Sequence, residues 1–153
     1  MKKLWLAGSG ALVVLVFAAA LFKPTRPRFS APEALAALAD PEASVADFMQ
    51  VVHGPKGLRL QVQQALRGSG PADDKAWRAV QARAVILGLL TTVILEKAKP
   101  KKGSPDSWKA QVDKYQKATE DLILATRARN RRAALEHVSV LGRSCKSCHK
   151  AHK

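Results

Sequence analysis

Two cysteines and a histidine near the end of the chain form the arrangement with the clearest chemical meaning. Cys145 and Cys148 are separated by two residues, and His149 follows at once. This Cys-X-X-Cys-His spacing is the attachment signature of c-type haem. Each thiol can add to one vinyl group of the same porphyrin, and the adjacent imidazole can bind the iron. We therefore predict one covalent haem c per chain, with Cys145 and Cys148 as thioether ligands and His149 as an axial iron ligand.

Three other roles for these residues compete with haem attachment. A disulfide between Cys145 and Cys148 fits a helical segment poorly, because helix geometry suits that bond badly. A thioredoxin-like dithiol would lie beside a βαβ pattern, and no segment of the sequence has strand periodicity. Zinc is the third alternative, since Cys145, Cys148, His149 and His152 share one helix face and are zinc-ligand types. Structural zinc sites usually draw on two separated pairs, which this sequence lacks, so haem is the preferred interpretation.

Residues 1–22 have the layout of a secretory signal peptide. Lys2 and Lys3 are followed by a mostly apolar run, and Ala18 and Ala20 could supply a cleavage site. The run is also about 28 Å long as a helix, close to the thickness of a bilayer core, so an uncleaved membrane anchor is equally compatible. Either alternative exports the rest of the chain. A periplasmic or exported location, with or without an anchor, agrees with haem attachment, which takes place outside the cytoplasmic membrane in bacteria.

The remainder of the chain divides into a linker with a short helix, residues 23–43, and one helical domain, residues 44–153. The domain opens with Ser44 to Asp47, a capping-box pattern with Asp in place of Glu. Gly54-Pro55 then predicts a kink or break, because proline removes a backbone donor and clashes with the preceding turn. Helix is expected to resume by Leu58.

Three further helix starts follow along the domain. Asp73 and Asp74 are suited to the positive end of a helix dipole. Ser104 caps the next helix, with Pro105 at its first position. Asn130 is a cap for the last helix. With the helix that begins at Ser44, these starts predict four long helices.

Each of the last three helices carries an inward stripe in steps of three and four, the packing pattern of a left-handed helical bundle. The stripe positions are Trp77, Val80, Ala84, Leu87, Thr91, Ile94 and Ala98, then Trp108, Val112, Tyr115, Thr119 and Leu122, then Ala134, Val138, Leu141, Cys145 and Cys148. The stretch from Val85 to Leu95 is apolar nearly all round, which predicts the most buried helix. The fold class is therefore all-α.

The same stripe pattern predicts whether several single side chains lie in the core or at the surface. The cysteines fall on the inward stripe of the last helix and not on a loop. We expect His137 to lie at the surface, and His152 to face solvent in preference to lining the haem edge. The aromatic rings of Trp77, Trp108 and Tyr115 are expected in the core and not at a cofactor.

Four long helices with the haem motif on the last one resemble the class II c-type cytochromes, the cytochrome c′-like family of four-helix bundles. The resemblance covers roughly residues 44–153. It rests on the motif at the extreme C-terminus and on FMQVVHG, residues 48–54, where a Met precedes a His by four residues. The resemblance implies an antiparallel four-helix bundle whose last helix holds the haem. The chain departs from the family in lacking an Arg just ahead of Met49 and in its Gly-Pro interruption.

The sixth iron ligand has three alternatives. The resemblance implies Met49, since a Met of the first long helix faces the far side of the haem in the relatives. His53 lies one turn later on the same face and is the alternative ligand, and only one of the two can reach the iron. An open sixth position is the third alternative. Met ligation favours electron transfer, whereas an open position binds small gases.

We expect an exported monohaem cytochrome that carries electrons. The alternatives are a haem protein that binds nitric oxide or carbon monoxide, and an exported metal-binding helical bundle without haem. The formal net charge of +14 favours redox partners with an acidic docking surface, or an anionic membrane surface, and export argues against nucleic acid. Relatives of this kind often form homodimers. No nucleophile-base pair or phosphate loop is recognisable in the sequence, so we expect no enzyme.

Overall fold

The computed structural model describes residues 36, 40, 42–97, 100 and 102–152. In this part of the chain all regular structure is helical, which confirms the all-α expectation there. The helices are α3 (Val45–His53), α4 (Leu58–Leu66), α5 (Asp74–Lys97), α6 (Pro105–Arg127) and α7 (Arg131–His152). None of the helices so described is long and apolar enough to cross a membrane. The predicted signal or anchor segment 1–22, and the predicted short helix apart from the helical residue Ala36, lie outside the described residues.

Helix α3 begins where the capping-box pattern predicts. The Asp47 backbone N–H donates to Ser44 Oγ at 3.3 Å, and the Ser44 N–H donates to Asp47 Oδ2 at 2.9 Å. The Ser44 hydroxyl also donates to Asp47 Oδ2 at 2.6 Å, and this bond, together with that from the Ser44 N–H, holds the pKa of the Asp47 carboxyl below its usual value. Because each residue satisfies a backbone donor at the helix start, the four-residue pattern defines this end of α3 by itself.

The predicted break at Gly54-Pro55 is confirmed, since α3 ends at His53 and α4 begins at Leu58. The Gly54 N–H still donates to the Gln50 carbonyl at 2.9 Å, but Pro55 has no N–H with which to continue the ladder. The chain then passes so close to α3 that a Cβ on Gly57 would lie 2.7 Å from the Val52 carbonyl oxygen. Glycine is therefore required at this close approach, which lets α3 and α4 both contact α5.

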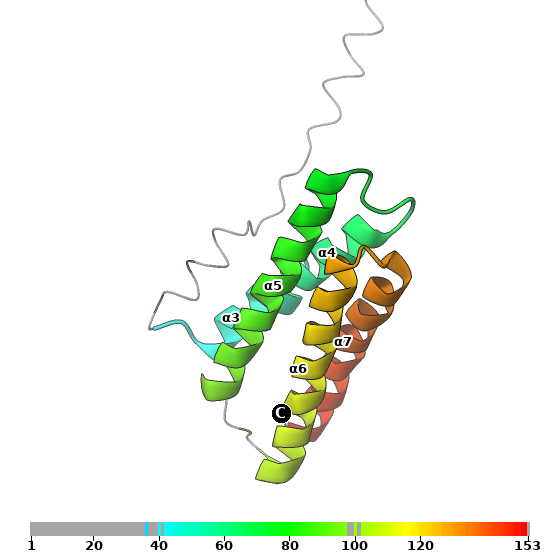
Figure 1. Ribbon diagram of the computed structural model, residues 1–153. Coiled ribbons are helices and arrows are strands. Elements are labelled where there is room, and N and C mark those ends of the chain that lie inside the picture. Colours follow the sequence, from blue (N-terminus) through cyan, green and yellow to red (C-terminus); the bar gives the residue numbers. More distant parts are fainter. Residues whose placement is uncertain (1–35, 37–39, 41, 98–99, 101, 153) are drawn as a thin grey trace, which may run out of the picture.

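The helices pack as a bundle around one apolar core (Figure 1). Helix α7 packs mainly against α6, α6 also packs against α5, and α4 contacts both α5 and α7. The largest fully buried apolar side chains come from every helix: Phe48, Val52, Leu58, Val62, Leu66, Leu87, Leu90, Leu122, Val138 and Leu141. Most of the predicted stripe positions are among the buried or core-packed residues, while the side chains of Ile94 and Ala98 lie outside the description.

The all-round apolar character of α5 does not produce all-round burial. Val85 is 38% exposed and Leu89 is 50% exposed, so the stretch that the sequence marks as most buried has an open side. The reason lies in the packing, because α3, α4 and α6 cover only part of the circumference of α5. The expectation that this is the most buried helix stays a prediction, with Val85 and Leu89 as exposed positions within it.

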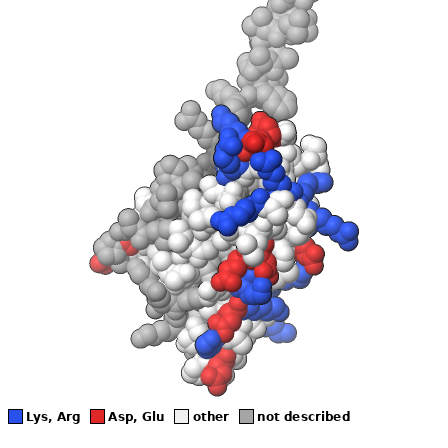
Figure 2. Space-filling view, viewed as in Figure 1, with Lys and Arg blue, Asp and Glu red and all other residues white. Residues whose placement is uncertain are grey.

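Charged side chains are distributed unevenly over the bundle. Figure 2 shows Lys and Arg gathered toward the end of the molecule where α5 begins. Exposed cations near the helix ends there are Arg67, Lys75, Arg78, Arg129 and Arg132. An ion pair at 2.8 Å between Arg129 and Asp74 links the turn after α6 to the start of α5. Arg131 donates to the carbonyl oxygens of Leu66 and Gly68. These hydrogen bonds join the start of α7 to the end of α4 at the same end of the molecule.

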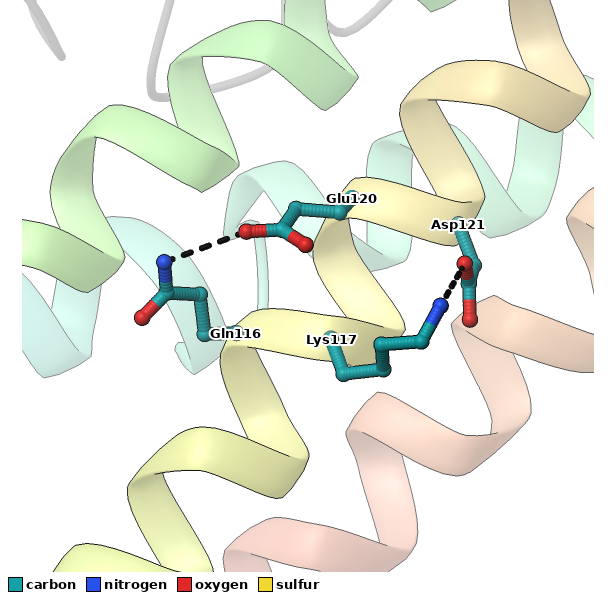
Figure 3. A network of polar contacts seen from close by, with 4 residues as sticks. All are labelled: Gln116, Lys117, Glu120 and Asp121. Carbon is teal, nitrogen blue, oxygen red and sulfur yellow. Dashed lines mark hydrogen bonds and ion pairs between the residues drawn. The ribbon is translucent and has the colours of Figure 1, made fainter.

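The outer face of α6 carries polar pairs spaced four residues apart (Figure 3). Lys117 contacts Asp121 at 2.5 Å, and Gln116 donates to Glu120 at 3.1 Å. Exposed pairs of this type contribute little to stability because water screens them and two long side chains must be ordered. They identify the solvent side of α6, opposite its buried stripe.

His152 is buried, which corrects the expectation that it faces solvent. Only 4% of the residue is exposed. Its Nε2 lies 3.3 Å from Ser107 Oγ, and its Nδ1 lies 3.0 Å from the Lys102 carbonyl oxygen. Its ring meets Trp108 edge-on, with ring centroids 5.3 Å apart. The sequence could not indicate these contacts, because they join the last turn of α7 to the start of α6, more than forty residues away.

Substituting His152→Ala is expected to lower the free energy of unfolding by about 2 kcal/mol, since two polar groups and an aromatic contact lose their partner. Chemical denaturation of the purified protein measures this change. His137→Ala is the matched control, because His137 lies on the same helix, is half-buried, and should change stability much less. Equal effects of the two substitutions would contradict a specific role for His152.

Candidate haem-attachment site

Helix α7 places both motif cysteines on the side of the helix that faces the bundle. Its earlier stripe residues Ala134, Val138 and Leu141 are fully buried, and the cysteines continue the same stripe. Cys145 and Cys148 are both half-buried and both are free thiols. Since they are three residues apart on one helix, about 4.5 Å along its axis, their side chains share a face. Their predicted position on the inward stripe of a helix is therefore confirmed.

The side chain of His53, on α3, contacts Cys145, on α7. Both ring nitrogens of His53 lie 3.3 Å from Cys145 Sγ, although 92 residues separate the two positions. The Tyr115 hydroxyl lies 3.0 Å from His53 Nε2, and the two rings meet edge-on with centroids 5.6 Å apart. Side chains from α3, α6 and α7 thus converge at the first motif cysteine.

The burial of this cluster keeps its members uncharged at neutral pH. Burial lowers the pKa of His53 to about 4, with smaller contributions from the charges of Arg59 and His149. Burial also raises the pKa of the Tyr115 hydroxyl and that of the Cys145 thiol. A neutral imidazole has a lone pair to offer a metal, whereas a protonated thiol is a poor nucleophile. The cluster therefore presents a neutral imidazole that could bind a metal.

Met49 and His149 have different surroundings from His53. Met49, one turn before His53, is half-buried and packs against the hydrophobic core. His149 is exposed on α7 immediately after Cys148. Of the two residues predicted as the sixth ligand, His53 has a contact with a motif cysteine, and Met49 packs against the core.

The residues present include the donor set of a c-type haem. Among the described residues no three His, Cys, Asp or Glu side chains gather to hold a metal, and His152 is turned toward Trp108. Two free thiols on one helix face with an imidazole beside them are the set that a porphyrin needs. Arg59, whose charge acts on Cys145, also has a buried Nε without a hydrogen-bond partner. A buried cationic donor without a partner suits a cofactor that carries negatively charged propionates.

Two residues of the cluster are not identifiable from the sequence alone. Tyr115 occupies a stripe position, as expected, but its hydroxyl reaches His53, so it belongs to the site as well as to the core. Its phenolic hydroxyl on the inward stripe is the one available signal. Arg59 has no such signal, because a single Arg near a helix start is ordinarily solvated.

Comparisons with protein-family models, with curated proteins and with solved structures give no match. The function of this protein is therefore inferred from its own residues and contacts.

Proposed function

We propose that this protein is an exported monohaem c-type cytochrome that carries electrons, with the antiparallel four-helix architecture of the class II family. In this proposal α3 and α4 together form the first helix, interrupted at Gly54-Pro55, and α7 is the haem-attachment helix. The observation that carries the proposal is the Cys-X-X-Cys-His motif on α7, with two free, half-buried thiols and the imidazole of His53 against the first of them.

The chain's residues have distinct roles in this proposal. Cys145 and Cys148 hold the cofactor by thioether bonds, and His149 is the axial ligand on the side of the motif. When bound, haem c supplies an iron that alternates between the ferric and ferrous states. His53 is our choice for the second axial ligand, in place of Met49, because of its contact with Cys145 and its neutral imidazole. The apolar core around Phe48 and Leu141 excludes water and lowers the local dielectric.

Location and partners follow from the N-terminal segment and the charge. Residues 1–22 direct export to the periplasm, whether they are cleaved or remain as a membrane anchor. Lys146 and Lys150, both exposed beside the motif, would face an acidic docking surface on a redox partner. A homodimer is compatible with this arrangement, and nucleic acid is not an expected partner.

A haem protein that binds nitric oxide or carbon monoxide is the second candidate. It is favoured if His53 stays away from the iron, because His53 and Tyr115 would then be polar groups beside an open sixth position. An exported metal-binding bundle without haem is the third candidate, and the described residues offer it no cluster of ligands.

Absorption spectra of the exported protein, oxidised and reduced, separate these candidates. The proposal predicts a Soret band and a six-coordinate, low-spin pattern in both oxidation states. A five-coordinate, high-spin pattern would favour the gas-binding alternative. A preparation without a Soret band, made in cells that attach haem to a known cytochrome, would leave only the alternative without haem.

A further inference from the structure

The end of the bundle where α7 begins carries a cluster of exposed cations (Figure 2). Four helix ends meet there, because short turns join α4 to α5 and α6 to α7, and Arg131 bonds to the end of α4. Cys145 lies about 21 Å further along the axis of α7 than Arg131. We call this surface the basic end, and its exposed cations are Arg67, Lys75, Arg78, Arg127, Arg129 and Arg132.

Acidic side chains do not balance the charge of the basic end. Asp73 accepts from the Ala76 N–H at 2.7 Å, so it caps the start of α5. Asp74 pairs with Arg129 at 2.8 Å. Among the described residues, this is the one ion pair formed by a cation of the basic end. On the outer face of α6, by contrast, the ion pairs shown in Figure 3 and its neighbourhood set each lysine against an aspartate. Unpaired cations gathered on one surface produce a positive potential that attracts a polyanion.

The residue types at the basic end favour phosphate groups on a lipid surface over a protein partner. The guanidinium group, which predominates there, binds phosphate oxygens through two parallel hydrogen bonds. Protein interfaces depend on a central cluster of aromatic or other large anchors. The basic end has one large exposed apolar side chain at its margin in the described residues, Leu124, one turn before Arg127 and 59% exposed. Cations beside a limited apolar surface are typical of peripheral membrane binding.

We propose that the basic end docks this protein on an anionic phospholipid bilayer. The arginines donate to lipid phosphate oxygens, and Leu124 enters the interfacial layer. Because α7 runs from the basic end toward Cys145 and Cys148, docking leaves the motif cysteines on the side away from the membrane. This inference goes beyond the proposed electron-carrier function and does not depend on haem attachment.

The test measures how fast an acetylating reagent modifies lysines of the full exported chain in the presence of vesicles. Lys75 reports on the basic end, and Lys114, exposed on α6, is the reference. Equimolar phosphatidylglycerol and phosphatidylcholine should slow modification of Lys75 about tenfold and leave Lys114 unchanged. Phosphatidylcholine alone should protect neither lysine. A retained segment 1–22 would insert into both kinds of vesicle, so equal protection by the two kinds would overturn the proposal.

Removing charge from the basic end should abolish this protection. The triple variant Arg67→Gln, Arg78→Gln and Arg132→Gln leaves the contacts of Arg129 and Arg131 intact. Its affinity for the anionic vesicles is expected to fall by about tenfold or more. Full protection in this variant would overturn the proposal.

The matched control variant carries Lys56→Gln, Lys102→Gln and Lys114→Gln, which remove the same net charge from exposed positions outside the basic end. It should keep the protection of Lys75 seen in the wild-type protein. Equal losses in the two triple variants would overturn the proposal, because net charge alone would then drive binding.

Other anions test the identity of the partner. Polyglutamate and inorganic phosphate, each compared with sodium chloride at the same ionic strength, should not protect Lys75. Protection by polyglutamate equal to that by anionic vesicles would assign the basic end to an acidic protein, and protection by phosphate would assign it to a free anion. Either result overturns membrane docking. A protein without haem that shows the expected protection would refute the proposed function alone.

Discussion

The double substitution Cys145→Ser and Cys148→Ser is expected to abolish covalent haem attachment completely. Both sulfurs that form the thioether bonds are removed, and these are the only cysteines in the chain. Because His149 remains, any haem bound by the variant would be held only by coordination and would leave on denaturation. The measurement is the absorption spectrum after denaturation and removal of small molecules, with the wild-type protein in parallel. Each single substitution should leave one thioether bond at most.

The control for this prediction lies within the motif itself. Lys146 and Ser147 are exposed between the two cysteines, so Lys146→Ala and Ser147→Ala should retain covalent haem. Covalently bound colour in the double cysteine variant would contradict the assignment of the thioether ligands. If the two control variants also lost covalent haem, any substitution between residues 145 and 148 would prevent attachment. The result for the cysteine variant would then not identify the cysteines as the thioether ligands.

The second large effect is expected from His53→Ala, which should convert a six-coordinate, low-spin haem into a five-coordinate, high-spin one. The imidazole of His53 contacts Cys145 Sγ at 3.3 Å, and its pKa of about 4 keeps it neutral and available as a ligand near neutral pH. Its loss would also open the sixth position, so carbon monoxide should bind the reduced variant more tightly. Absorption and electron paramagnetic resonance spectra report the change of spin state.

Met49→Ala is the matched comparison, because Met49 lies one turn away on the same helix. Its side chain packs against the apolar core, so this substitution should lower stability and leave the spin state unchanged. The reverse pattern, a spin-state change in Met49→Ala and none in His53→Ala, would identify methionine as the ligand. A five-coordinate wild-type protein would contradict both assignments.

Local sequence rules predict the helix starts and the interruption of the first helix. Ser104 and Asn130 cap α6 and α7 through bonds to backbone N–H groups three residues ahead. The break at Gly54-Pro55 is equally local, because it depends on a missing donor and on a close backbone approach at Gly57. The inward placement of Cys145 follows from helical periodicity alone. These features need no knowledge of the partner helices.

Features that depend on how the helices face one another could not be predicted in this manner. The sequence places Met49 and His53 on one face of a helix but cannot say which of them meets Cys145. That choice depends on the rotation of α3 relative to α7. The burial of His152 and the open side of α5 at Leu89 have the same origin. Periodicity defines a stripe, whereas the width of the covered surface depends on the neighbouring helices.

The central claim is tested most directly by the mass of the mature protein, exported by cells whose haem-attachment machinery is shown to be active. We predict a mass that exceeds that of the processed polypeptide by one haem, with the added mass located on the peptide that contains Cys145 and Cys148. A mass equal to that of the bare polypeptide, with both thiols free to react with an alkylating reagent, would contradict the account.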